Sequence, residues 1–334
     1  MARNRDDEDV VAVLTALMAV IDDDDDDDQL LFDKTKKKAH IPIRCDARDV
    51  KGDIYGTAFF EPWVGMPTGL YDWLWKGMRE PIREPRNIYF EYTDAENKRR
   101  RRRPCKISDE NRFIEFLHTM NENGRVWTSA SCNGWNISSV SRDFIHVLMQ
   151  FCKTYSTEWI CKMDVEEKRN YQGTWEQYPD AYQLMDGSMY RRRKTKNLPD
   201  GVQREDYYDH KLKMPEAVDV QAVCNPIGFC TELLTGGPGS MGDANLSQFI
   251  CQDDWKNSTL VDGTYPQRPQ FIKCDGTIEH KRARVGVEWL FGRNKTDWSL
   301  TGTIYRKSSR FHNLAIRASF TLSNMKKMWT TEPW

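Results

Sequence analysis

The sequence predicts an α/β fold, a mixed sheet flanked by helices and preceded by a mainly helical region. After about residue 180, short segments that alternate apolar and polar residues are followed by a strong helical pattern, which is typical of an α/β domain. Before that point, over 108–152, apolar residues recur at helical spacing. With 334 residues, the chain has room for one large domain or two ordinary ones.

The net charge of −1 hides two oppositely charged parts of the chain. Residues 1–31 hold two Arg against eleven Asp and Glu, a net charge of −9, which leaves +8 for residues 32–334. Blocks of like charge such as Asp22–Asp28 repel themselves, so residues 1–38 are predicted to be a disordered acidic and basic tail. The basic body predicts a nucleic-acid or anionic-membrane partner.

The apolar runs and the cysteines argue against a membrane-spanning or secreted chain and against a zinc- or disulfide-based fold. The longest apolar run, Val10–Ile21, is too short to cross a bilayer, and its acidic flanks do not fit a signal peptide. The nine cysteines form no Cys-x-x-Cys pair and are odd in number. They therefore predict reduced, mostly buried thiols and no zinc site or disulfide framework.

Residues 39–178 are predicted to form the mainly helical N-terminal region, with a helix-turn-helix at about 108–152. A first helix opens at Ser108, a short piece covers 127–132, and a third helix opens at Ser138. An ordinary three-helix core is the alternative to a DNA-reading motif. The apolar residues expected inside the first helix are Phe113, Phe116, Leu117 and Met120, and those inside the third are Val140, Phe144, Val147, Leu148 and Phe151. The side chains that the third helix is expected to expose to DNA are Ser139, Ser141, Arg142 and His146.

Residues 179–327 are predicted to form the α/β core. Strands are expected around 182–185, 218–222, 229–234 and 260–262, and a helix over His280–Lys295. That helix is expected to turn Val285, Val287, Leu290 and Phe291 inward, with Glu288 among them.

Four acids stand at conspicuous places in this core. Asp186 and Asp262 are expected at strand ends, Asp243 at a loop-to-helix junction and Glu288 within the last helix, with Asp186 and Glu288 half-buried. Hard oxygen ligands from separated positions are what Mg²⁺ or Mn²⁺ prefers. Each acid alone is a weak signal, because an Asp-Gly pair is usually a turn and a helical Glu is usually solvated.

Five strings of this region occur together and in order. They are Leu184–Ser188 (LMDGS), Val220–Gly228 (VQAVCNPIG), Pro238–Asp243 (PGSMGD), Asp262–Pro266 (DGTYP) and Arg282–Arg293 (RARVGVEWLFGR). The set resembles the DDE-type transposases of the Harbinger superfamily. The separations also fit, with 57 residues from Asp186 to Asp243 and 45 from there to Glu288.

The resemblance implies an RNase H-like core and a metal-dependent DNA endonuclease or transposase that cleaves and joins phosphodiester bonds. Asp186, Asp243 and Glu288 would be catalytic, and all four acids, Asp262 included, would be ligands of a divalent metal, Mg²⁺ or Mn²⁺, with two ions bound. Whether Asp243 or Asp262 is the main second ligand is left open at this point.

Basic residues around the acids are expected to hold DNA phosphates. The run Lys98–Arg103 predicts a nuclear localisation signal or a further phosphate contact, so a nuclear location is expected. The resemblance also implies a separate Myb-like DNA-binding partner, leaves a homo-oligomer open and gives no role to a membrane. The predicted phosphate-binding residues of the core are Arg191, Arg192, Arg193, Arg282, Arg284, Arg293 and Lys295.

A rival interpretation is a domesticated or decayed transposase that binds DNA without catalysis. The four acids favour the enzyme. The flanks favour the rival, because the family usually continues after Asp186-Gly187-Ser188 with His and apolar residues, whereas Met189–Lys194 follows here.

Overall fold

The computed structural model describes residues 50–84, 107–122, 135, 137–192, 208, 216–252, 255–303, 305 and 311–331. The predicted tail over 1–38, the basic run Lys98–Arg103 and the short helical piece over 127–132 lie outside these residues. Across the described ranges, no helix is both long enough and apolar enough to cross a membrane.

The N-terminal part of the described chain is helical, as the sequence predicts. The helix α5 (Asp109–Asn121) begins where Ser108 caps it by accepting a hydrogen bond from the backbone N–H of Asn111. It is enclosed by its neighbours, so that every residue from Asn111 to Met120 is buried. The other helices of this part are α2 (Val50–Ile54), α3 (Phe60–Val64), α4 (Thr68–Arg83), α7 (Ile137–Phe151), the π-helical turn η3 (Cys152–Ser156), α8 (Thr157–Trp159) and α9 (Val165–Tyr171).

The apolar faces predicted for the helices that begin near Ser108 and Ser138 are confirmed, since all nine of the predicted side chains are buried. The prediction that His146 is exposed is wrong. Its side chain is 2% exposed, and its Nε2 lies 3.0 Å from the carbonyl oxygen of Ile82, because the end of α4 packs against α7. Of the predicted DNA-reading side chains, Arg142 is exposed, whereas Ser139 and Ser141 are half-buried.

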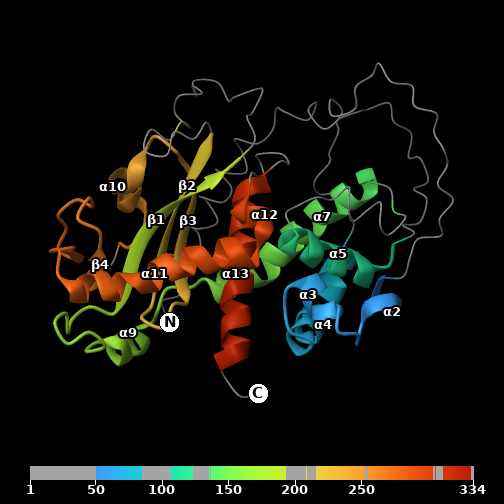
Figure 1. The fold of residues 1–334 in the computed structure, drawn as a ribbon, viewed down its shortest axis with the longest axis horizontal. Helices are drawn as coiled ribbons and strands as arrows, with labels where there is room; N and C mark the ends of the chain where they lie inside the picture. Colours follow the sequence, from blue (N-terminus) through green and yellow to red (C-terminus); the bar gives the residue numbers. More distant parts are fainter. Residues whose placement is uncertain are drawn as a thin grey trace, which may run out of the picture.

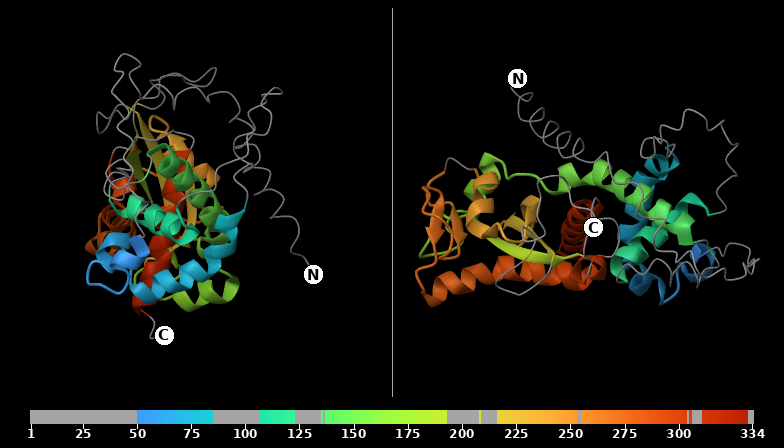
Figure 2. Two further views of the ribbon diagram at one scale, coloured as in Figure 1. Left: turned by 90° about the vertical axis from the view of Figure 1, so that its right-hand side faces the viewer. Right: turned by 90° about the horizontal axis from the view of Figure 1, so that it is seen from above.

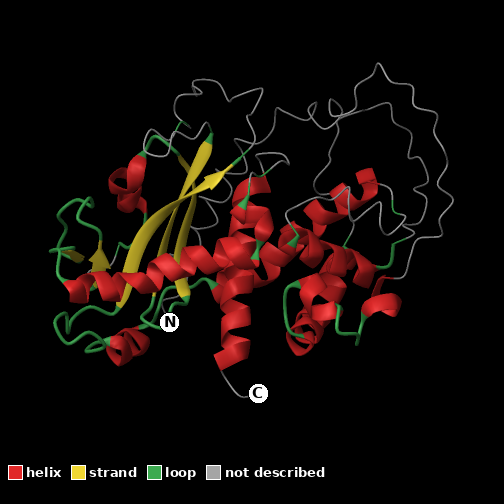
Figure 3. Cartoon of the chain, in the orientation of Figure 1, coloured by secondary structure: helices red, strands yellow, loops and turns green. Residues whose placement is uncertain are grey.

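The C-terminal part is built on an open, mixed sheet of five strands, which confirms the α/β class among the described residues (Figures 1 and 3). The strand order is β3-β2-β1-β4-β5. The first three strands pair antiparallel, and β4 and β5 run parallel to β1. The strands are β1 (Gln183–Arg191), β2 (Ala217–Cys224), β3 (Cys230–Pro238), β4 (Thr259–Val261) and β5 (Phe271–Lys273).

The expectation that Asp186 stands at a strand end is wrong, because β1 continues through it to Arg191. Asp186 pairs with Ala222 and Gly187 with Gln221, so the Asp-Gly pair is held in the middle of the ladder and makes no turn. Asp262 does follow the end of β4, as predicted.

Two long helices cover one face of the sheet. Helix α11 (Ile278–Asp297) runs along β1, and α13 (His312–Thr331) stands between the sheet and the N-terminal helices (Figures 1 and 2). Ile316 and Phe320 of α13 belong to the core under the sheet, whereas Ala318 and Leu322 belong to the core of the helical part. The short elements between these are α10 (Gly242–Leu246), the 3-10 turn η5 (Ser247–Phe249) and α12 (Ser299–Gly302).

Candidate functional site

Asp186 and Asp262 lie on the same face of the sheet, at neighbouring strands. Side chains alternate between the two faces of a strand, so each acid shares a face with the residue two positions before it. These residues are Leu184 and Leu260, which pair across β1 and β4 and both pack in the core beneath α11. The parallel register of the two strands therefore aims both carboxylates at α11.

A single guanidinium group joins the two acids. Arg284 of α11 donates from Nη2 to Asp186 Oδ2 over 2.9 Å, and its Nη1 lies 3.3 Å from Asp262 Oδ1. The side chains of Arg284 and Asp186 are 12% and 18% exposed, whereas that of Asp262 is 42% exposed. Arg284 and Asp186 thus form an ion pair that is largely removed from water. Asp262 contacts the same guanidinium from the side that faces solvent.

The pKa of Asp186 reflects this setting. Burial raises the pKa above the ordinary value of an aspartate, while the nearby Arg284 cation and the Gly187 N–H, which bonds Oδ1 over 2.9 Å, act to lower it. The negative charge of Asp243 adds to the upward shift. Burial thus outweighs the two stabilising contacts in setting the direction of the pKa shift, and the Arg284 cation offsets part of it.

Asp243 approaches β1 from the opposite face. Its Oδ1 accepts a hydrogen bond of 3.1 Å from Nε2 of Gln221, the residue that pairs with Gly187. A Cβ atom at Gly187 would lie 1.8 Å from that same Oδ1, so only glycine leaves room for the carboxylate. Asp262, and not Asp243, shares a cation with Asp186, while Asp243 lies against the strand beside it.

Glu288 is not half-buried as the sequence predicts, because its side chain is exposed. The residues of α11 that face the core include Ala283, Val287 and Leu290, whereas Val285, which is also predicted to face inward, is only half-buried. At about 100° per residue, Glu288 lies about 40° around the helix from Arg284 and further from the buried stripe. It stands one turn beyond Arg284, on the rim of the face that carries the two aspartates.

The acids that face α11 have the chemistry to hold a hard cation. Within the described ranges, no group of three or more His, Cys, Asp or Glu side chains is arranged to hold a metal ion. Asp186 and Asp262 nevertheless already share one cationic group, with oxygens from both pointing at it. A divalent ion that took the place of the guanidinium would find these two carboxylates as ligands.

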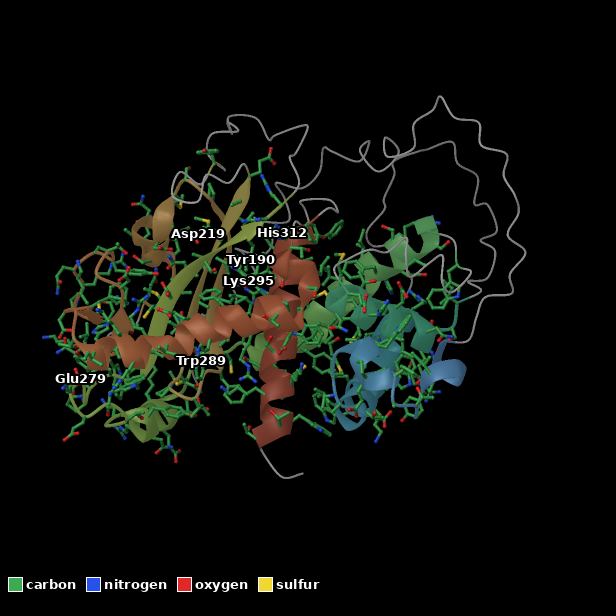
Figure 4. All side chains as sticks on the ribbon, in the orientation of Figure 1. Tyr190, Asp219, Glu279, Trp289, Lys295 and His312 are labelled. Atoms are coloured by element: carbon green, nitrogen blue, oxygen red, sulfur yellow. The ribbon has the colours of Figure 1, made fainter. Side chains whose placement is uncertain are left out.

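The predicted phosphate-binding cations fall into two sets. Arg282 and Arg293 are exposed on α11. Arg284 and Lys295 instead point toward β1: the Nζ of Lys295 donates to Ser188 Oγ over 2.6 Å and to the Met189 carbonyl over 2.9 Å. Figure 4 shows Lys295 beside Tyr190, whose ring lies 4.5 Å from Nζ.

The predicted phosphate-binding cations at the end of β1 and just after it are Arg191, Arg192 and Arg193. Arg191 is exposed, and Arg192 lies 3.8 Å from the buried carboxylate of Glu216. Arg193 lies outside the described residues.

Sequence reasoning missed two parts of this site. The sequence pattern places Arg284 among the phosphate-binding cations, whereas its position one turn before Glu288 indicates a neighbour of the acids. Gln221 is a polar residue inside a strand that is buried on both faces, and such a residue needs a hydrogen-bond partner. Here that partner is Asp243.

Comparison of the chain with protein-family models, with curated proteins and with solved structures gave no match.

Proposed function

We propose that this protein is a metal-dependent DNA endonuclease or transposase whose centre is formed by Asp186, Asp262 and Glu288, while Asp243 lies against the opposite face of β1. The observation that carries the proposal is the convergence of Asp186 and Asp262 on one cation. The sheet order β3-β2-β1-β4-β5, with β2 antiparallel and β4 parallel to β1, is compatible with the RNase H-like core that the sequence motifs imply.

In this proposal, hydrogen bonds within the chain hold the carboxylates of Asp186 and Asp262 in position. Asp186 is held rigidly within β1, with Oδ1 bound to the Gly187 N–H, so that Oδ2 faces the shared cation. Asp262 is held by the Gly263 N–H at 2.7 Å and by Thr264 Oγ1 at 3.2 Å. A bound Mg²⁺ or Mn²⁺ would activate a water or 3′-hydroxyl and stabilise the leaving oxygen of the phosphodiester.

Glu288 would complete the centre from α11. Glu288 and Arg284 lie on adjacent turns of the same side of α11, so a rotation of the Glu288 side chain is the change that would bring its carboxylate toward the two aspartates. Exposed side chains change rotamer within nanoseconds, so the exposed position of Glu288 is compatible with a role as ligand.

One observation favours the second candidate, a DNA-binding protein without catalysis. Arg284 already pairs with both Asp186 and Asp262 and offsets one of their two negative charges, so each carboxylate has a cationic partner without a metal. A domesticated or decayed transposase would retain such an arrangement together with the exposed cations Arg282 and Arg293.

Cleavage of supercoiled plasmid separates the two candidates. We expect nicking with Mg²⁺ or Mn²⁺, none with EDTA, and loss of nicking in Asp186→Ala and Glu288→Ala. Glu279→Ala is the matched control, because Glu279 is an exposed acid in the first turn of the same helix (Figure 4). Full cleavage by Glu288→Ala would refute its assignment, and no metal-dependent cleavage by the unmodified protein would favour the DNA-binding candidate.

A further inference from the structure

A groove lies on the side of α11 that faces away from Lys295 and β1. It has a volume of about 480 Å³ and is bordered by α11, α13 and the turn between β2 and β3. Figure 4 shows Trp289 on this side of α11, below the helix in that view, whereas Lys295 is above it. The groove is distinct from the space between Asp186 and Asp262.

The wall formed by α11 is a regular stripe. Arg282, Gly286, Trp289 and Arg293 all line the groove and recur at i, i+4, i+7 and i+11, so they lie on one side of the helix. At about 1.5 Å per residue, the two arginines stand about 16 Å apart. Phosphates along one strand of a duplex advance about 3.4 Å each, so this span reaches several nucleotides.

The centre of the stripe is an exposed aromatic ring. The side chain of Trp289 is 68% exposed, and Ile227 opposite it in the β2–β3 turn is 52% exposed. Both line the groove, and the indole of Trp175 borders it as well. Apolar groups of this size left at the surface of a soluble domain mark a contact site when they gather in one concave place.

The groove carries an excess of positive charge. Its lining includes four cationic side chains, Arg282, Arg293, Lys326 and Lys327, against one carboxylate, that of Asp297. Asp297 lies 3.5 Å from Lys326. Lys327 donates to the Ile227 carbonyl, and the charge of Arg293, after burial, helps to lower the pKa of Lys327. Like charges held together in this way favour an anion between them.

We propose that this groove binds an unpaired strand of DNA, with a base stacked on Trp289 and with backbone phosphates on Arg282, Arg293 and Lys327. An aromatic platform within a cationic groove is the combination that binds single strands without sequence preference. The concave shape favours an unpaired base over a duplex, whose bases are stacked inside. The inference deepens the proposed nuclease function and rests on it, because it names a form of substrate that would be held by the groove side of α11, the helix that also carries Glu288.

Binding is measured in EDTA, with a fluorescein-labelled 20-nucleotide oligo(dT) and with a 20-base-pair duplex. We expect Trp289→Ala to weaken oligo(dT) binding by about 5- to 100-fold and duplex binding by less than about two-fold, and Trp289→Phe to restore most of the loss. Phe249→Ala is the matched control, because Phe249 is 58% exposed and lies outside the groove. Arg293→Gln should lower the slope of log K against log salt by about 0.7, whereas Arg79→Gln on α4 should leave the slope unchanged.

A second readout identifies the occupant. Oligo(dT) should quench the tryptophan fluorescence of the unmodified protein. This quench should be much smaller in Trp289→Phe, which keeps only Trp175 at the groove, although that variant still binds. Equal oligo(dT) affinity in Trp289→Ala and the unmodified protein would overturn the proposal. So would quenching of Trp289 by the acidic peptide of residues 1–31 but not by oligo(dT), since the groove would then hold the chain's own tail. EDTA prevents cleavage, so failure here is distinguishable from failure of the plasmid assay.

Discussion

Replacing Arg284 by Gln tests whether its guanidinium occupies the position of a metal ion. The variant leaves Asp186 18% exposed and without its cation. Removing one partner of a buried ion pair costs about 3–5 kcal/mol of unfolding free energy. Asp186 keeps its bond from the Gly187 N–H and some contact with water, so we expect about 2–3 kcal/mol here. The exposed Asp262 should add less than about 1 kcal/mol.

The measurement is urea unfolding at pH 7, without metal and with Mn²⁺. Asp186→Asn combined with Arg284→Gln leaves no uncompensated charge at the buried position, since the remaining carboxylate, that of Asp262, is 42% exposed. This double variant should therefore be more stable than the sum of the two single changes predicts. Arg282→Gln, an exposed change on the same helix, should alter stability by less than about 0.5 kcal/mol.

Metal gives the decisive comparison. Mn²⁺ at about 100 times its dissociation constant should stabilise Arg284→Gln by about 2.7 kcal/mol. It should stabilise the unmodified protein less, because there the ion must displace the guanidinium. The reasoning is refuted if Arg284→Gln is as stable as Arg282→Gln without metal, or if Mn²⁺ stabilises the double variant as much as Arg284→Gln.

Two further predictions concern other charges of the chain. Burial lowers the pKa of Lys295 from 10.5 to about 8, so between these values the unfolded state binds more protons and the free energy of unfolding should rise with pH. Urea unfolding at pH 7.5 and pH 10 should show this rise in the unmodified protein and a smaller one in Lys295→Met; equal slopes would contradict it. Removal of residues 1–31, with its net charge of −9, should strengthen non-specific DNA binding, because the acidic segment competes with phosphate for the basic body. If a salt-matched binding assay shows no change on truncation, the segment acts only as a solubilising appendage.

The periodicity of apolar residues is enough to predict the helices and strands that have a strong apolar pattern. It predicts α5, α7, β2 and α11, since apolar residues recur at a regular spacing in the sequence of each. Periodicity does not predict the strand β5, because three residues are too few to show a period. It does not predict helix α13 either, because this helix packs against two cores and its apolar residues do not form a single stripe.

The sequence motifs name the candidate acids but not their geometry. The resemblance implies that Asp186 and Asp262 both contribute to one metal site, and in the structure both carboxylates lie against one cation. The sequence does not reveal that Arg284 lies between them, since this depends on how far α11 is rotated against the sheet. A rotation of about 40°, less than half of the angle between consecutive residues, separates the position of Arg284 from that of Glu288.

The position of α13 has a consequence for how the protein folds. Asn324 accepts a hydrogen bond from the Cys230 N–H at 2.9 Å and donates to the carbonyls of Cys230 and Trp159, so one side chain ties this helix to both β3 and α8. Helix α13 also follows all the other described elements in the chain, so during synthesis neither core can close until it has left the ribosome. We expect the two parts to unfold in a single transition, and chains that stop before residue 312 to aggregate, because they would expose apolar surface on both sides of the missing helix.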